Sequence, residues 1–274
     1  MTGIQSGKIT FHTQPVNDIW ARDCGPIYVF DEDGNPVITN WKFNSWGEKY
    51  PPFDADDALP DYFAGYFNQP QIKSDMVLEG GSIDVNGKGT LLTTESVLLN
   101  PNRNPNLTKQ EIKKSLKKHL GVRHIIWLKS GLEGDDTDGH IDDLTRFVSP
   151  TKVVTMVTDD KSDVNYKRLL ENLDILKSAV DQDGNLLEII ELPMPLTKTD
   201  EATVDGSEYV PASYANFYIA NNQVLLPLYD DRYDEMVIKL FQKLFLNHKI
   251  TGIPCADLVW GQGSIHCITQ QLYY

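Results

Sequence analysis

The chain has 274 residues, of which 41% are hydrophobic and 23% charged, as is typical of a folded globular protein rather than a disordered or fibrous one. Its formal charge of −14 at pH 7 argues against a nucleic-acid partner and favours a small cation. Its three cysteines, Cys24, Cys255 and Cys267, are too few for a disulfide framework or a four-thiolate zinc site.

Reduced thiols are typical of a cytoplasmic protein, which is the expected location. The start of the chain lacks the apolar stretch of a secretion signal, and no run of residues is long enough to cross a bilayer, so no membrane partner is expected.

The first part of the chain is predicted to form a strand pair over residues 25–30 and 37–43, joined by turn residues 33–36. Just before it, the motif WARDCGP at residues 20–26 places Trp20, Arg22 and Asp23 ahead of a Gly-Pro turn. By itself this cluster favours a structural ion pair at the beginning of a strand.

Strand-like runs follow at residues 76–85 and 90–93. Within the first, the motif EGGSID places Glu79 before two glycines, which allow positive φ angles or a close approach to a ligand. An ordinary turn is the simpler local interpretation. Thr108 and Glu111 then form a capping-box pattern and Gly121 a stop signal, so a helix is predicted over residues 108–120, with a strand at 123–128.

An acidic segment at residues 135–143 precedes strand-like runs at 144–149 and 153–157. If His140 and Asp142 lie in extended backbone, their side chains point to the same side, because strand side chains alternate with period two. One face would then carry an imidazole beside a carboxylate. A solvated acidic loop is an equally good interpretation of these residues.

In the last third of the chain, apolar residues at helical spacing predict helices over residues 163–180 and 231–245. Strands are predicted at 186–192, 216–220, 223–228 and near the end of the chain. A strand pair, a helix and a further strand thus recur along the chain. This order suggests modular α/β repetition, which we interpret as a single domain over residues 1–274.

Cys267 follows the glycine-containing stretch 261–264, where a turn could present its sulfur to a cleft for use with a distant histidine as base. A buried free cysteine is the commoner alternative. His266 is the less suitable partner, because adjacent side chains on a strand face opposite ways. The six histidines form no H-x-H or H-E-x-x-H pattern and no phosphate-binding loop is present, so neither a metal nor a cofactor is expected.

Four motifs in this order, WARDCGP, EGGSID, GHIDDLTRF and GSIHCITQQ, resemble the agmatine deiminase and bacterial peptidylarginine deiminase family of the guanidino-group-modifying superfamily. The resemblance includes the connecting segment TTESVLLNPNRNP and spans residues 17–271. It implies a pseudo-fivefold α/β propeller, or pentein, with the active site at its central axis. Family members carry several dozen residues before the first motif, so the N-terminal part of the first module is expected to be lacking here.

The resemblance also implies roles for five residues. Cys267 would be the nucleophile and His140 the general acid and base, while Asp23 and Asp142 bind the guanidinium and Glu79 supports the histidine and the substrate. Carboxylates suit this task because a guanidinium is planar, cationic and rich in N–H donors. Thiolate attack, loss of ammonia and hydrolysis of a thiouronium would need no metal or cofactor.

The expected partner is a small cationic guanidino compound, agmatine, whose ammonium would bind to Asp136 and Asp138 while Trp20 covers the alkyl chain or the cation. The leading hypothesis is hydrolysis of agmatine to N-carbamoylputrescine and ammonia. The alternatives are deimination of peptide-linked arginine, transfer of the amidino group to an amine, and an inactive truncated family member that acts only as a binding protein. A homo-oligomer is left open.

Overall fold

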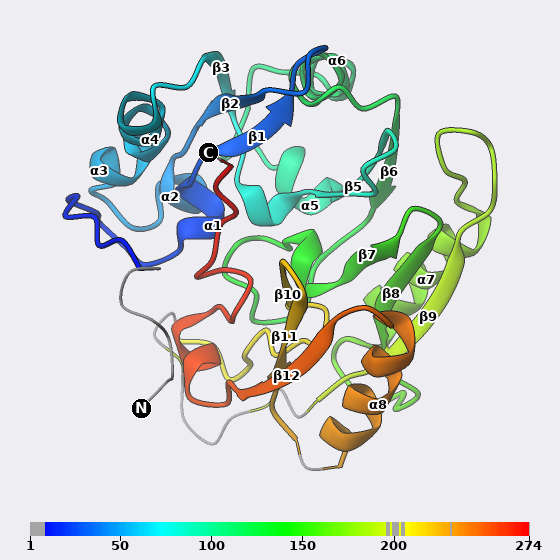
Figure 1. Cartoon of the computed structure of the whole chain (residues 1–274). Coiled ribbons are helices and arrows are strands. Elements are labelled where there is room, and N and C mark those ends of the chain that lie inside the picture. Colours follow the sequence, from blue (N-terminus) through cyan, green and yellow to red (C-terminus); the bar gives the residue numbers. More distant parts are fainter. Residues whose placement is uncertain (1–8, 196–197, 199–202, 204–205, 231, 274) are drawn as a thin grey trace.

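The computed structural model describes residues 9–195, 198, 203, 206–230 and 232–273, which form four three-stranded sheets (Figure 1). In each sheet the first two strands form an antiparallel hairpin, and the third strand runs parallel to the second. Helical segments connect the second strand to the third in all four. The predicted recurrence of a strand pair, a helix and a strand is therefore confirmed.

The strands of the four sheets follow in chain order. They are β1 (Ile27–Phe30), β2 (Pro36–Lys42) and β3 (Gln71–Val77); β4 (Asp84–Val85), β5 (Thr90–Thr94) and β6 (His124–Leu128); β7 (Thr145–Ser149), β8 (Lys152–Val157) and β9 (Glu188–Pro193); and β10 (Tyr218–Ala220), β11 (Gln223–Leu228) and β12 (Lys249–Pro254).

The α-helices are α1 (Ala21–Cys24), α2 (Ser45–Glu48), α3 (Asp54–Asp57), α4 (Leu59–Phe67), α5 (Glu95–Leu98), α6 (Lys109–Leu120), α7 (Tyr166–Ser178) and α8 (Asp234–Leu244). Short 3-10 helices are η2 (Gly80–Ser82), η3 (Ile141–Asp143) and η4 (Leu258–Gly261). The capping box predicted for α6 is confirmed. The Thr108 hydroxyl accepts from the Glu111 amide at 3.3 Å, the Glu111 carboxylate accepts from the Thr108 amide at 2.8 Å, and Gly121 ends the helix at a φ of 68°.

One hydrophobic core runs through the last three sheets. It includes Leu92 of β5, Val154 of β8 and Leu226 of β11, together with Leu169 of α7 and Phe241 of α8. All five side chains are buried, and full burial of such a side chain contributes about 1.5–3 kcal/mol. Because this core is shared, the sheets stabilise one another and are not independent units.

The sheets follow one another around the molecule, with α4, α6, α7 and α8 toward the outside (Figure 1). The C-terminal segment returns to the first module, where the Arg22 amide donates to the Cys267 carbonyl at 2.9 Å. The segments that precede the first strands, α1 before β1, η2 before β4 and η3 before β7, pack side by side. These segments and the residues next to them carry Asp23, Glu79, His140 and Asp142.

One strand prediction and one premise about the backbone are wrong, and both concern the site. The strand predicted over residues 76–85 is interrupted, because β3 ends at Val77 and the chain forms η2 before β4 begins at Asp84. The backbone before β7 is not extended either, because residues 141–143 form η3. The premise that His140 and Asp142 share one face of a strand is therefore wrong, and their proximity has another origin.

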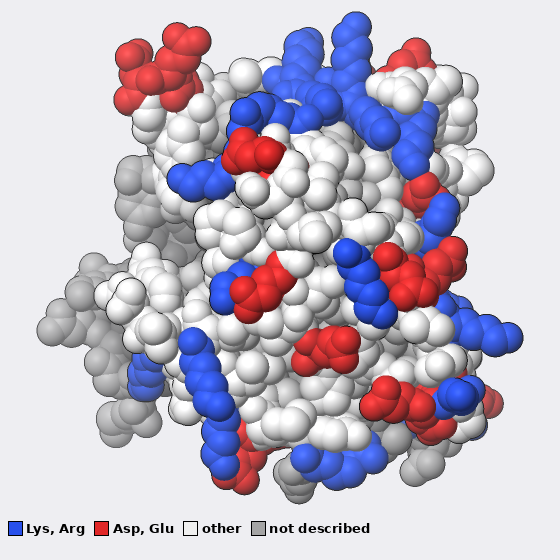
Figure 2. Space-filling model, turned by 90° about the vertical axis from the view of Figure 1, so that its right-hand side faces the viewer, with Lys and Arg blue, Asp and Glu red and all other residues white. Residues whose placement is uncertain are grey.

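Charge is distributed unevenly over the surface. Figure 2 shows Lys and Arg gathered near the top of one face, the level at which α6 lies in Figure 1. Lys114, Lys117 and Lys118 are exposed on this helix. In the part of the chain that the structure describes, no helix is both long enough and apolar enough to cross a membrane.

Candidate active site

The five residues predicted to carry the chemistry come from four connecting segments and lie in the buried interior. Asp23 belongs to α1, Glu79 precedes η2, His140 precedes η3, Asp142 lies within η3, and Cys267 occupies a turn after η4. Each side chain belongs to a residue that is at most 6% exposed. Residues up to 244 positions apart in the sequence are thus brought together. Across the same separation, Nε of Arg22 donates to the His266 carbonyl at 3.4 Å.

Gly81 lets the segments converge. Its amide donates to Oδ1 of Asp23 at 3.0 Å. A Cβ at this position would lie 2.6 Å from Nδ1 of His140 and 2.7 Å from Oδ1 of Asp23, closer than real atoms approach. Gly80 is similarly confined, since its Cβ would lie 2.1 Å from the Arg22 carbonyl oxygen. The paired glycines therefore allow close contact between chain segments.

Asp23 is held by two donors. Its Oδ2 accepts from the Trp46 indole at 3.0 Å, and its Oδ1 accepts from Gly81. Burial raises the pKa of Asp23 from 3.8 to about 6, even though these two hydrogen bonds lower it. The carboxylate is therefore ionised at neutral pH but is close to its titration range.

His140 has a fixed backbone and an incompletely engaged ring. Its amide donates to Oδ2 of Asp135 at 3.0 Å, and its Nδ1 lies 3.6 Å from Oδ1 of Asp23 and 4.0 Å from Oδ1 of Asp142. Burial lowers the pKa of His140 below 6.5, and the nearby charge of Glu79 only partly offsets it. Glu79 thus acts in the expected direction, but burial leaves the imidazole neutral at pH 7.

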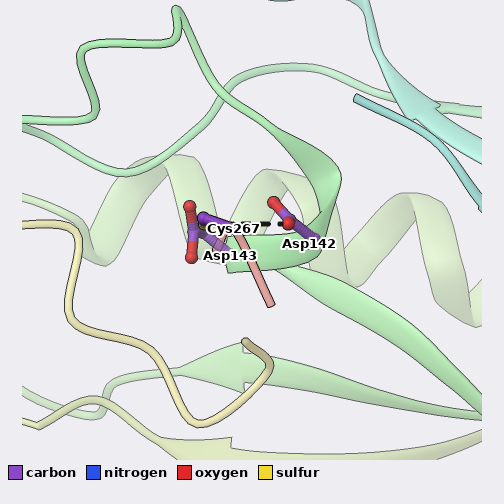
Figure 3. Close-up of side chains that lie close together, drawn as sticks. All are labelled: Asp142, Asp143 and Cys267. Carbon is purple, nitrogen blue, oxygen red and sulfur yellow. Dashed lines mark hydrogen bonds between the residues drawn. The ribbon is translucent and has the colours of Figure 1, made fainter. Parts of the chain in front are cut away.

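Cys267 faces two carboxylates of η3. Figure 3 shows Asp142, Asp143 and Cys267 pointing toward one another, with Sγ 4.0 Å from Oδ2 of Asp142. Burial raises the pKa of the Cys267 thiol well above its ordinary value, and the charges of Asp142 and Asp143 raise it further. Burial and the neighbouring Asp23 likewise raise the pKa of Asp142. In the absence of a bound cation, the thiol of Cys267 and the carboxyl group of Asp142 therefore favour their neutral, protonated forms.

Two residues of this cluster were missed by the sequence interpretation. Asn216 donates from Nδ2 to Oδ1 of Asp143 at 2.8 Å and to Sγ of Cys267 at 3.2 Å. His266 is hydrogen-bonded through Nδ1 to Oδ2 of Asp142 at 2.6 Å. The reason given for setting His266 aside is wrong, because residues 265–268 form a turn and not a strand. No motif in the sequence marked Asn216.

Three buried polar atoms in this region have no hydrogen-bond partner among the described residues. They are Oε2 of Glu79, Nε2 of His140 and Oδ1 of Asp142. Buried polar atoms are nearly always paired, so these three require a ligand or water. Two of them are carboxylate oxygens, and an ionised carboxylate accepts hydrogen bonds but donates none. A ligand with several N–H donors and a positive charge would satisfy them.

A cavity of about 100 Å³ leads to Cys267. Its walls include Trp20, Asp23, Trp46, Tyr50 and Asp136. Trp20 and Asp136, two of the residues predicted to bind the substrate, therefore share a cavity with the cysteine.

The third of them, Asp138, is not part of this wall. Its carboxylate accepts from Arg103 at 2.6 Å, from Asn102 at 3.0 Å and from Lys49 at 3.0 Å. These partners lower the pKa of Asp138, against burial, which raises it. Asp138 is thus committed to protein contacts.

Asp142, Asp143 and Cys267 offer ligand atoms within 4.8 Å of one another, the spacing that a metal ion could bridge. Two hard carboxylates with one soft thiol do not match the donor preference of a single class of metal. A guanidinium supplies the positive charge that this cluster favours, and its N–H donors also fit the unpaired oxygens. The donor chemistry therefore fits an organic cation better than a metal.

Comparison with known proteins places the chain among the deiminases. The family described as Porphyromonas-type peptidyl-arginine deiminase matches residues 1–272. A protein of Mycoplasma mycoides subsp. mycoides, named as a candidate agmatine deiminase, is 42% identical over 271 residues, covering 93% of this chain and 74% of its own length.

Solved structures agree with this placement. The agmatine deiminase of Enterococcus faecalis superimposes with a TM-score of 0.87 at 34% identity, covering 92% of this chain and 74% of that one. An agmatine deiminase of C. jejuni with substrate bound gives a TM-score of 0.86 at 36% identity, covering 95% and 75%. The mixed α/β fold is shared with both. The chain belongs to the Porphyromonas-type peptidyl-arginine deiminase family.

Proposed function

We propose that this protein is an agmatine deiminase, which hydrolyses agmatine to N-carbamoylputrescine and ammonia. The observation that carries the proposal is the set of unpaired buried atoms on Glu79, His140 and Asp142, close to a buried cysteine. The names of the relatives from M. mycoides, E. faecalis and C. jejuni support agmatine as the substrate.

We also propose that the fold is a pseudo-fivefold α/β propeller that forms one catalytic domain. Four segments precede the first strands of the four sheets, and they carry Asp23, Glu79, Asp142 and Asn216. The segment with Cys267 follows the fourth sheet and meets them in the same region. Five converging segments are what five modules around one axis would supply.

The guanidinium would lie between Asp23 and Asp142. Its N–H donors would pair with Oδ1 of Asp142 and with Oε2 of Glu79, neither of which has a partner otherwise. Burial, and after it the neighbouring carboxylates, holds the pKa values of Cys267, Asp142 and Asp143 high, and the positive charge of the guanidinium would offset this effect. Substrate binding itself would therefore promote formation of the thiolate.

In the first half of the reaction the Cys267 thiol loses its proton to the neutral His140, and the thiolate attacks the central guanidinium carbon. A C–S bond forms and a tetrahedral adduct results. His140 then donates the same proton to one nitrogen, whose C–N bond breaks as ammonia leaves. A covalent thiouronium remains on Cys267.

In the second half His140, neutral again, removes a proton from water as the oxygen attacks the same carbon. The adduct collapses as the C=O bond forms and the C–S bond breaks. Its hydroxyl proton passes to solvent, where it converts the released ammonia to ammonium, and His140 returns its own proton to the sulfur. The product is a ureido compound, and the protein regains its starting protonation state. A neutral resting imidazole, favoured by its lowered pKa, suits both proton removals.

The other end of the substrate would extend along the cavity toward Asp136. Trp20, which lies so close to Gly263 that no side chain fits at that position, would cover the alkyl chain. Asp136 would bind the ammonium, next to the Tyr50 hydroxyl that donates to it at 2.6 Å. Asp138 would act through the protein instead of touching the substrate.

The test is to incubate the protein with agmatine, free arginine and a blocked arginine peptide, and to measure ammonia and ureido product. Agmatine should be the preferred substrate, and Cys267→Ser should be inactive. The control variant Cys255→Ser alters a cysteine outside the cavity wall and should remain active. Preference for the peptide would favour the activity in the family's description.

Two further outcomes would contradict the mechanism. Ammonia release that survives in Cys267→Ser would exclude the proposed nucleophile. Product that appears only with an added amine, without ammonia, would indicate amidino transfer. If no guanidino compound reacts at all, the proposed function is wrong.

A further inference from the structure

Arg103 is a fully buried cation that the proposed chemistry leaves unexplained. It lies in the segment between α5 and α6, and its side chain is 0% exposed. Its Nε donates to Oε1 of Glu79, its Nη1 donates to Oδ2 of Asp138 at 2.6 Å, and its Nη2 donates to the Thr137 carbonyl at 2.9 Å. Burying a charge is costly unless it is paired, so this arrangement implies a specific use.

The first consequence concerns Glu79. Because Arg103 holds Oε1, the carboxylate cannot rotate freely, and Oε2 is left without a partner among the described residues. A planar guanidinium is well suited to fix a carboxylate in this way. Arg103 therefore orients the oxygen that the substrate would use.

The second consequence concerns the segment that leads to His140. Arg103 binds Thr137 and Asp138, and the next residue, Gly139, has a φ of 113°. Asp138 itself has a positive φ of 69°, which is unfavourable for a residue with a side chain. Its contacts with Arg103, Asn102 and Lys49 hold it in this conformation. The backbone that ends at His140 is thus anchored by the same cation.

We propose that Arg103 is a positioning residue for the deiminase reaction, joining Glu79 to the segment before His140 so that both groups meet the guanidinium. The proposal rests on the proposed function. It assigns Asp138 to the support of Arg103 and leaves Asp136, in the cavity wall, as the carboxylate for the substrate's ammonium. The substrate touches neither Arg103 nor Asp138.

A double-mutant cycle tests whether Arg103 acts through Glu79. Arg103→Gln and Glu79→Gln should each lower kcat for agmatine about 100-fold, with KM changed by less than about threefold. The double variant should lose much less than the product of the two single losses, because part of the effect of Arg103 passes through Glu79. Multiplied losses would overturn the proposal.

Titration of His140 by NMR gives a readout that needs no turnover. Burial is the main cause of the lowered pKa of His140; the charge of Glu79 opposes this lowering and the charge of Arg103 adds to it. Glu79→Gln should therefore lower the His140 pKa, and Arg103→Gln should raise it. Arg103→Lys should restore the charge and most of the pKa but only part of kcat, since an ammonium lacks the planar fork. An unchanged His140 pKa in Arg103→Gln would refute the positioning role.

Asp138→Asn weakens the contact between Arg103 and the segment before His140 while keeping Arg103 itself. This variant takes the place of Arg103→Gln in the test if Arg103→Gln does not fold. Lower kcat with a near-normal KM is expected. A rise of about tenfold or more in KM at unchanged kcat would mean that Asp138 binds the substrate and would overturn the proposal. Arg168→Gln is the control, because Arg168 ties the neighbouring residues Gly131 and Glu133 to α7 without reaching the site, and kcat should be retained.

Failure of the proposed function has a different signature. If the unaltered protein releases ammonia from no guanidino compound, the function is wrong, whereas the His140 titration still reports whether Arg103 and Glu79 act on the imidazole.

Discussion

Nδ2 of Asn216 lies 3.2 Å from Sγ of Cys267 and donates to it. The same nitrogen also donates to Oδ1 of Asp143 at 2.8 Å, so one amide bridges the thiol and a carboxylate. The charges of Asp142, Asp143 and Asp23 oppose the ionisation of this thiol, whereas a backbone hydrogen bond with Ser264 favours it. Asn216 adds a neutral side-chain donor that is placed to stabilise the thiolate.

Asn216→Asp should make Cys267 less reactive, because a further carboxylate replaces a donor and raises the pKa of the thiol further. Alkylation by iodoacetamide at fixed pH should slow about tenfold, which corresponds to one pKa unit. Asn216→Leu should give a smaller effect. Asn172→Asp, at a buried asparagine of α7 that binds the Lys129 amide, is the control and should react normally. Equal rates in all variants would show that the amide does not influence the sulfur.

Gly81→Ala should abolish activity, because the new Cβ would displace the His140 ring and the Asp23 carboxylate. We expect kcat/KM for agmatine to fall at least about 100-fold and the free energy of unfolding to fall by about 1–3 kcal/mol. The matched control is Gly65→Ala in α4, where a Cβ meets nothing within 4 Å.

That control should be active and slightly more stable, by about 0.5–1 kcal/mol, because alanine favours helix. Kinetics and urea unfolding measure both variants. Normal turnover in Gly81→Ala would mean that His140 and Asp23 tolerate displacement.

Asp23 should make the protein less stable as the pH rises. Its pKa in the folded protein is raised from 3.8 to about 6, so the folded state keeps a proton that the unfolded state has already lost between these values. This contribution to stability is complete below the unfolded pKa and is lost as the pH rises through about 6. The loss amounts to about 3 kcal/mol at neutral pH.

Asp23→Asn removes this titration. The unfolding free energy of the variant, relative to the unaltered protein, should therefore increase by about 3 kcal/mol from below about pH 3 to about pH 8. Urea unfolding across this range measures the change. The asparagine offers Trp46 and Gly81 only one acceptor oxygen, and the cost of this loss does not vary with pH. The part of the difference that varies with pH therefore reports the titration of Asp23. A difference that does not vary with pH would contradict the raised pKa.

Asp136→Asn should weaken agmatine binding without slowing the chemistry, because Asp136, in the cavity wall, would bind the ammonium and not the guanidinium. We expect KM to rise about tenfold at nearly constant kcat. A guanidino compound with the same alkyl chain but no ammonium should show no difference between the variant and the unaltered protein. An unchanged KM for agmatine would remove Asp136 from the proposed ammonium site.

Much of the fold could be predicted from local patterns. The alternation of strand pairs and helices is confirmed, as is the capping box of α6, because these features depend on neighbouring residues. The errors near the site are the strand predicted over residues 76–85, which η2 interrupts, and the premise of extended backbone at residues 140–142, where η3 begins. There the backbone follows contacts with distant segments, such as Gly80 against Arg22, which override local strand preference.

The sequence by itself determined the family and the residue types of the site, because Cys267, His140, Asp23, Glu79 and Asp142 lie in motifs whose order is specific. Only the tertiary structure decided how these groups are engaged. It revealed His266 on Asp142, Asn216 on Cys267 and Arg103 on Glu79. It also showed that burial lowers the pKa of His140 by more than the charge of Glu79 raises it. Such effects arise from desolvation and contacts between segments far apart in the chain, which no local spacing encodes.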